Sequence, residues 1–128
     1  MATQKRLSEA EWEVMDGIWH LDRQVRVRDV VNYLYPNGEK AYTTVQTIMN
    51  ILFRKGVLNR QKIGSVNMYT PTLSRQDAAQ DETRTLVSRM YEGSFGALAT
   101  YLVDSGALSQ QELDELRVLI EAKEKGGT

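Results

Sequence analysis

The order of its local patterns constrains the fold of this chain more than any other feature. Three segments with helical spacing come first, two short runs typical of β-strands follow, and the rest of the chain is helical again. The strand-like runs are residues 57–63 and 66–70, with Gly64-Ser65 between them and Pro71 after them. This arrangement predicts a two-stranded hairpin with a short turn, so the chain is expected to be mainly α with a small β-hairpin.

The first two predicted helices have clear boundaries. Ser8 and Glu11 match the S-x-x-E capping box, at the start of a helix that is expected to run to about His20. A second helix is expected over residues 28–35, where a Pro-Asn-Gly sequence ends it and favours a turn. Residues 24–27, between the two helices, are either a short strand or an extended linker.

The third predicted helix, residues 41–56, has an apolar stripe on one side and a polar, nearly uncharged surface on the other. The polar residues can hydrogen-bond to base edges or phosphates: Thr43, Thr44, Gln46, Thr47, Asn50 and Arg54. Threonine methyl groups can also contact thymine methyl groups, and Gln and Asn can pair with adenine edges. Two alternatives stay open: an ordinary solvated helix face and, for Thr43 or Thr44, a role as the helix cap.

The charge distribution favours a negatively charged partner for the first part of the chain. Residues 1–73 contain ten Lys and Arg against seven Asp and Glu, whereas residues 74–128 contain six against ten. Residues 40–76 contain six Lys and Arg and no acidic residue, which suits a polyanion. Arg60 and Lys62 alternate along the first strand, so they share a face that could meet phosphate or, alternatively, protect a strand edge.

Three helices followed by a hairpin are the element order of a winged helix-turn-helix domain. In such a domain the third helix enters the major groove of DNA and the hairpin, or wing, lies along the backbone. This order and the acid-free stretch predict a winged-helix domain over residues 1–73 that binds double-stranded DNA. The alternative is a protein–protein interaction module without DNA binding, because Tyr33, Tyr35 and Tyr42 could lie on an exposed surface.

Residues 74–128 are predicted to form a helical dimerisation region. Helical patterns cover residues 74–91 and 94–103, and a second S-x-x-E box at Ser109 starts a last helix, before a polar tail over residues 123–128. About fifty residues are few for an independent core, so a homodimer would cover the apolar faces, unless they pack back onto the first domain. The expected dimer contacts are Phe95, Leu98, Leu102, Leu113, Leu116 and Ile120.

Composition and motifs exclude several functions. The chain has no cysteine, which excludes disulfides and thiolate metal sites and fits a reducing cytoplasm. It shows no signal peptide and no apolar run long enough for membrane insertion, so a cytoplasmic location is expected. Motifs of P-loop, zinc-hydrolase and serine-hydrolase sites are absent, and the single histidine, His20, is expected to stabilise a helix end. Neither enzymatic activity nor a metal or cofactor is expected.

Four stretches of the sequence match the pattern of a known bacterial family: LSEAEWEVMDGIW, AYTTVQTIMNILFRKGVL, QKIGSVNMYTP and LSQQELDELRVLI. They resemble the penicillinase repressor family, also called BlaI/MecI, and the resemblance extends over nearly the whole chain. It implies a transcriptional repressor that acts as a homodimer on a dyad operator, in the known members at β-lactamase and methicillin-resistance genes. In antibiotic-responsive members a membrane sensor-protease triggers cleavage in the C-terminal region, which corresponds here to the segment GALATYLVDSG.

Two positions depart from the family pattern. The family often has arginine where this chain has Ile51, and it tends to have arginine after the hairpin glycine, where this chain has Ser65. Both differences remove positive charge near the DNA, so the operator sequence and the affinity are expected to differ from those of better-known members; alternatively, Ile51 packs inside the domain or on the wing. A copper-responsive branch uses a cysteine cluster, which this chain lacks, so copper sensing of that kind is excluded.

Overall fold

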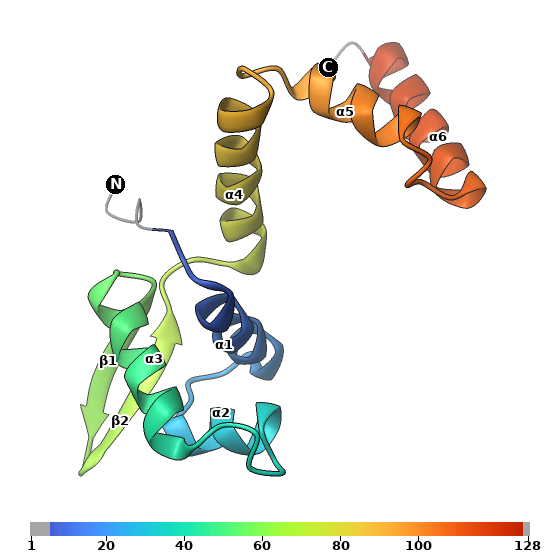
Figure 1. Ribbon diagram of the computed structural model, residues 1–128. Coiled ribbons are helices and arrows are strands. Elements are labelled where there is room, and N and C mark those ends of the chain that lie inside the picture. The colour runs from blue at the N-terminus through green and yellow to red at the C-terminus, as the bar shows by residue number, and fades with distance from the viewer. Residues whose placement is uncertain (1–5, 127–128) are drawn as a thin grey trace. The chain divides into compact units, whose positions relative to one another are not determined.

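Six helices and one two-stranded hairpin make up residues 6–126, which are the residues that the computed structural model describes (Figure 1). Residues 1–5 and 127–128 lie outside the described part, which therefore leaves out the first residues of the N-terminal segment without a predicted signal peptide and the end of the predicted polar tail. The chain divides into two compact units, one ending at Ala79 and the other beginning at Gln80.

Helix α1, Glu9–Leu21, begins at the predicted capping box. The backbone N–H of Glu11 donates to Ser8 Oγ at 3.2 Å, and the N–H of Ser8 donates to Glu11 Oε1 at 3.0 Å. This reciprocal pair satisfies two N–H groups, one of which the start of a helix would leave without an intrahelical partner. The start signal read from the sequence is therefore confirmed.

Helix α2, Val27–Leu34, follows a short extended segment. The sequence allows either a strand or a linker in that segment, and Val25 forms an isolated antiparallel bridge there with Tyr69. The Val25 N–H donates to the Tyr69 carbonyl at 3.0 Å, and the Tyr69 N–H donates to the Val25 carbonyl at 2.7 Å. The start of α2 is therefore fixed to the root of the hairpin by two backbone hydrogen bonds.

Helix α3, Tyr42–Arg54, has Ala41 as its N-cap, and no side chain accepts a hydrogen bond there. The cap role considered for Thr43 or Thr44 is wrong, because the helix starts before both residues and places them inside its first turn. At the other end, Gly56 has a φ of 82°. This left-handed conformation after the helix is what the sequence predicts for that glycine.

The hairpin consists of β1, Leu58–Ile63, and β2, Val66–Pro71, paired antiparallel around the predicted Gly64-Ser65 turn. It lies beside α3 in Figure 1, and its root contributes to one hydrophobic core with the three helices. The core side chains are Val14, Met15, Ile18, Val25, Val27, Val30, Val31, Tyr35, Val45, Met49, Leu52, Val57, Leu58 and Tyr69. The first unit is thus a winged helix-turn-helix fold, as the order of elements predicts.

The second unit contains the larger part of α4, Arg75–Met90, together with α5, Phe95–Asp104, and α6, Gln110–Gly126. The predicted capping box of α6 is confirmed, since Ser109 and Glu112 bond to each other's backbone N–H groups at 2.9 and 3.1 Å. The predicted polar tail is wrong for residues 123–126, which continue α6. No helix-breaking residue precedes Gly126, and lysines in the last turn favour a helix C-terminus.

Candidate nucleic-acid interface

The outer side of α3 is the centre of the candidate interface. Thr43, Thr44, Thr47 and Arg54 are exposed, whereas Gln46 and Asn50 are partly buried. No acidic residue lies in the first turn of this helix. The predicted polar side therefore faces solvent, although not all of its members are equally accessible.

Thr47 has a defined hydroxyl orientation. Its Oγ1 donates a hydrogen bond to the Thr43 carbonyl, one turn earlier, at 2.9 Å. Because the proton is used inside the helix, the lone pairs of Oγ1 are what the side chain can offer to a partner. In this orientation Thr47 can accept a hydrogen bond from a base amino group and can present its methyl group to a thymine.

Asn50 has a different environment from the threonines, because it connects α3 to the hairpin. Its Oδ1 accepts a hydrogen bond from the Tyr69 hydroxyl at 2.7 Å and one from Arg60 Nη1 at 3.1 Å. The Arg60 guanidinium also lies 4.1 Å from the centroid of the Phe53 ring. These contacts orient the wing relative to α3, and they leave the amide nitrogen of Asn50 as the group without an assigned partner.

Arg60 and Lys62 both lie exposed on β1, as the sequence predicts for alternating residues. Lys62 stands opposite Asn67 of β2 and has no ion-pair partner among residues 6–126. Ile51, where the family pattern has arginine, is partly buried. The exposed cations of this surface therefore come from the end of α3 and from the wing.

Three of the six basic residues in the acid-free stretch form ion pairs with carboxylates of α1. The pairs are Lys40 with Glu13 at 3.0 Å, Lys55 with Glu11 at 2.6 Å and Arg75 with Asp16 at 2.5 Å. Sequence reasoning missed these pairs, since each joins residues far apart in the chain. The acidic residues of α1 were the available signal, but their partners depend on how α1 packs.

The α1 pairs change carboxylate acidity. Burial raises the pKa of Glu11, but hydrogen bonds from Lys55 and from the Ser8 backbone, together with the charge of Lys55, lower it further than burial raises it. The pKa of Glu13 is lowered by hydrogen bonds from the Tyr35 hydroxyl and from Lys40. Tyr35 is buried and donates to Glu13 Oε1 at 2.5 Å, so it does not belong to an exposed tyrosine surface.

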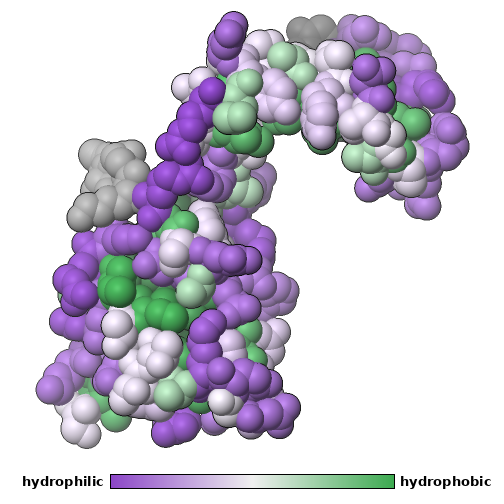
Figure 2. Space-filling view, in the orientation of Figure 1, coloured by the Kyte–Doolittle hydropathy of each residue, from purple (hydrophilic) through white to green (hydrophobic). Residues whose placement is uncertain are grey.

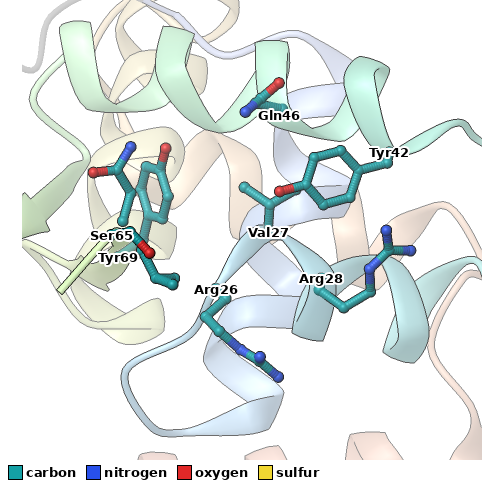
Figure 3. A pocket seen from close by; sticks show the side chains of 9 residues that line it. Arg26, Val27, Arg28, Tyr42, Gln46, Ser65 and Tyr69 are labelled. Atoms are coloured by element: carbon teal, nitrogen blue, oxygen red, sulfur yellow. The ribbon is translucent and has the colours of Figure 1, made fainter. Parts of the chain in front are cut away.

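A hollow that the sequence did not indicate lies between the start of α2, the first turns of α3 and the hairpin turn (Figure 3). Its lining residues are Arg26, Val27, Arg28, Tyr42, Gln46, Ser65, Val66, Asn67 and Tyr69. The guanidinium carbon of Arg28 lies 4.6 Å from the centroid of the Tyr42 ring. Below, this space is called the α2–α3–wing hollow.

Arg26, at the N-cap of α2, is already paired within the protein. Its Nη2 donates to Asp29 Oδ1 at 2.7 Å, its Nε donates to Asp29 Oδ2 at 3.2 Å, and its backbone N–H donates to Oδ2 at 2.9 Å. The hydrogen bond from the Arg26 side chain is the main reason that the pKa of Asp29 falls to about 2. Asp29 thus stays ionised and neutralises Arg26 at neutral pH.

The predicted dimer residues lie on α5 and α6 of the second unit. Phe95, Leu102, Leu116 and Ile120 are exposed, and Leu98 and Leu113 are partly buried. Apolar side chains reach the surface of this unit in Figure 2. Among residues 6–126, no helix combines the length and the apolar character that crossing a membrane requires.

Comparison with known proteins identifies relatives over most of the chain. The family model of the penicillinase repressor matches residues 7–122. The methicillin resistance regulatory protein MecI of Staphylococcus aureus strain N315 is 26% identical over 117 residues, which are 91% of this chain and 94% of MecI. The penicillinase repressor of Bacillus licheniformis is 29% identical over 116 residues, which are 91% of this chain and 90% of that protein.

A solved structure also aligns with part of the chain. It is the solution structure of the monomeric form of Bacillus licheniformis BlaI in complex with the blaP half-operator. The alignment covers 57% of this chain and 88% of that chain, with 34% sequence identity and a TM-score of 0.48.

Proposed function

Because the chain belongs to the penicillinase repressor family, we propose that it is a sequence-specific DNA-binding repressor of transcription that acts as a homodimer on a dyad operator. The observation that carries this proposal is the outer side of α3, where exposed threonines stand in a helix with no acidic residue. Short hydroxyl side chains allow a helix to approach base edges closely, and the absence of acids avoids repulsion from phosphates.

The proposed roles follow from the chemistry of each residue. Thr43, Thr44, Gln46 and Thr47 would read the bases, while Arg54, Arg60 and Lys62 would contact phosphates. Asn50 would contact bases or phosphates through its amide N–H groups alone, because its oxygen already accepts hydrogen bonds from Tyr69 and Arg60. The helix would thus supply specificity and the wing would supply orientation and affinity.

Exposed apolar side chains support the homodimer. Phe95 of α5 is 54% exposed and Ile120 of α6 is 55% exposed, and a small helical unit gains stability when a second copy covers such residues. The proposed contacts are the six predicted side chains of α5 and α6. A twofold dimer would place its two α3 helices at half-sites about one DNA turn apart.

The relatives and the family resemblance support further proposals about this chain. They are repressors and regulators of penicillinase and methicillin resistance, so we propose β-lactamase-type or related genes as targets and no catalytic activity for this chain. Residues 96–106, in α5 and the turn after it, would be the region where a sensor-protease relieves repression. Cleavage there would divide the proposed dimer surface. A repressor of this kind would act in the bacterial cytoplasm.

Selection of bound duplexes from a random pool tests the main proposal. We expect a recovered motif with twofold symmetry and half-sites about one turn apart, and binding that weakens steeply with salt. A chain that enriches no duplex and shows no salt-dependent binding would instead be a protein-interaction module. The pool is the appropriate probe because the operator does not have to be known.

Substitutions of Thr47 and Lys62 separate the two proposed kinds of contact. Thr47→Val removes the hydroxyl and Thr47→Ser removes the methyl group, so together they show which atom reads the base. Either loss should reduce the preference for the selected duplex over random DNA. Lys62→Ala should instead weaken both duplexes about equally and lower the log–log salt slope by about 0.9. Unchanged discrimination in both Thr47 variants would contradict the groove assignment of α3.

A further inference from the structure

We propose that the α2–α3–wing hollow seats a phosphate of the DNA backbone and that Arg28, held on the ring of Tyr42, is the residue that binds it. This inference rests on the proposed function and adds a contact from α2 to those of α3 and the wing. The sequence did not mark Arg28, because it lies outside the acid-free stretch and in a different helix from the threonines.

Arg28 is the cation of the hollow that is free to bind. Among residues 6–126 it has no ion-pair partner, and its described contact is the Tyr42 ring, 4.6 Å from the guanidinium carbon. Arg26, on the same wall, is matched by Asp29 at 2.7 Å. The two arginines therefore differ: the side chain of Arg26 is engaged by Asp29, while Arg28 retains its full capacity for an anion.

Tyr42 gives Arg28 a defined position. The ring belongs to the first residue of α3 and is 36% exposed, so its face is available to the guanidinium. Stacking on an aromatic face holds an arginine without using its N–H donors, which remain directed at a ligand. The stacked pair reduces the side-chain entropy that Arg28 would lose on binding phosphate.

The remaining lining suits an anion rather than an apolar ligand. No carboxylate lines the hollow, and its polar side chains besides the arginines are neutral: Gln46, Ser65, Asn67 and the tyrosines. The side chains of Tyr42, Gln46 and Arg28 project from two different helices around the same open space in Figure 3.

The hollow also adjoins the proposed base-reading surface. Gln46 lines it and directly precedes Thr47, about 100° away around the helix. Tyr42 directly precedes Thr43, and Ser65 belongs to the wing turn. A duplex whose bases meet Thr43 and Thr47 would bring one backbone strand to this edge of α3. A phosphate there would be contacted from α2, α3 and the wing together. Such a contact fixes the register of the protein on the duplex but does not read the base sequence.

The test measures affinity and salt dependence for the full chain with the selected duplex and with random DNA. Arg28→Ala should lower the log–log salt slope by about 0.9 and weaken both duplexes by a similar factor, about tenfold. Arg28→Gln should give the same result with a smaller change in side-chain volume. Arg28→Lys should keep the slope and recover only part of the affinity, because lysine keeps the charge but loses the stacked plane.

Tyr42 variants test the positioning role. Tyr42→Ala should weaken binding severalfold, with little further loss when Arg28→Ala is added, whereas Tyr42→Phe should bind like the unchanged protein. Arg117→Ala is the matched control, because Arg117 is an exposed arginine of α6 paired with Asp114 at 3.1 Å. It should change neither slope nor affinity. Circular dichroism and thermal melting of each variant check that the fold is retained.

Each outcome decides between distinct conclusions. If the unchanged protein selects a symmetric duplex but Arg28→Ala and Arg28→Gln keep its slope and affinity, the phosphate seat is wrong and the repressor proposal stands. If Arg28→Ala alters only the discrimination between duplexes, Arg28 reads bases and the phosphate assignment is wrong. If the unchanged protein binds no duplex, both proposals fail together.

Discussion

Replacing Lys55 by methionine should destabilise the first unit without changing the salt dependence of DNA binding. Lys55 belongs to the acid-free basic stretch, yet its Nζ lies 2.6 Å from Glu11 Oε1 and 2.9 Å from the Arg6 carbonyl. It therefore serves α1 rather than a polyanion. Methionine keeps most of the apolar stem and removes the charge, so the variant isolates the ion pair from the packing of the side chain.

The magnitude follows from the burial of the pair. The Lys55 side chain is 19% exposed and that of Glu11 is 10% exposed, so the pair lies between a surface pair and a fully buried one. Exposed pairs contribute about 0–1 kcal/mol, and removing one partner of a buried pair costs about 3–5 kcal/mol. Because Glu11 retains its hydrogen bond from the Ser8 N–H, we expect a loss of about 2 kcal/mol in the free energy of unfolding at pH 7.

The loss should depend on pH in a defined direction. The pKa of Glu11 in the folded protein is lowered from its ordinary value of 4.5, so its contribution is present above that value and disappears as the pH falls through the folded pKa. Without Lys55, less opposes the effect of burial on the Glu11 carboxylate, so the pKa of Glu11 rises. The difference between the two proteins should therefore be largest near neutral pH and should shrink as the pH falls below 4.5 and through the lowered folded pKa of Glu11.

Urea denaturation followed by tryptophan fluorescence at pH 7 and at a series of lower pH values measures the effect, since Trp12 and Trp19 both lie in α1. Glu11→Gln alone and combined with Lys55→Met completes a double-mutant cycle. An equal loss at all of these pH values would refute the ion-pair reasoning and indicate a packing defect. A salt slope lowered as in Lys62→Ala would show that Lys55 contacts DNA after all.

Three further predictions concern other contacts. Tyr69→Phe removes the hydroxyl that donates to Asn50 at 2.7 Å, and urea denaturation should show a loss of about 1 kcal/mol together with a looser wing and weaker binding to any duplex. Asp29→Asn should lower the free energy of unfolding by about 1 kcal/mol at neutral pH, which is less than the folded pKa of about 2 suggests because Arg26 is half exposed. Because the folded pKa of Asp29 is lowered, urea titrations should show that this difference vanishes as the pH falls toward 2. Leu116→Asp should yield monomers in sedimentation at micromolar concentration and weaken dyad binding far more than binding of a half-site, whereas an unaltered dimer would exclude this part of α6 from the interface.

Local signals in the sequence were sufficient for the elements and their order. A capping box such as Ser8 with Glu11 involves residues three apart, and the hairpin turn involves adjacent ones, so both are visible without knowledge of the fold. The periodic apolar residues of α3 similarly predict which side faces the core. The predicted end of α6 is too early because a polar stretch does not by itself end a helix, and Lys and Glu are good helix formers.

The partners of charged side chains were not predictable in the same way. Charge counting gives the same weight to Lys55 and Lys62, but Lys55 is matched with Glu11, 44 residues away, whereas Lys62 is exposed on the wing. The sequence does not distinguish Asn50 from its polar neighbours on α3, whereas in the structure Asn50 accepts a hydrogen bond from the Tyr69 hydroxyl of β2. Each of these outcomes depends on how α1 and the hairpin pack against α3.

The sequence alone thus determined a three-helix and hairpin order, an acid-free α3 and its threonine face, because these follow from residue spacing within single elements. Only the tertiary structure decided which cations remain free, because ion pairing and stacking act over a few ångströms between elements distant in the chain. In the folded protein Lys40, Lys55 and Arg75 form ion pairs with carboxylates of α1, and Arg28 lies over the ring of Tyr42.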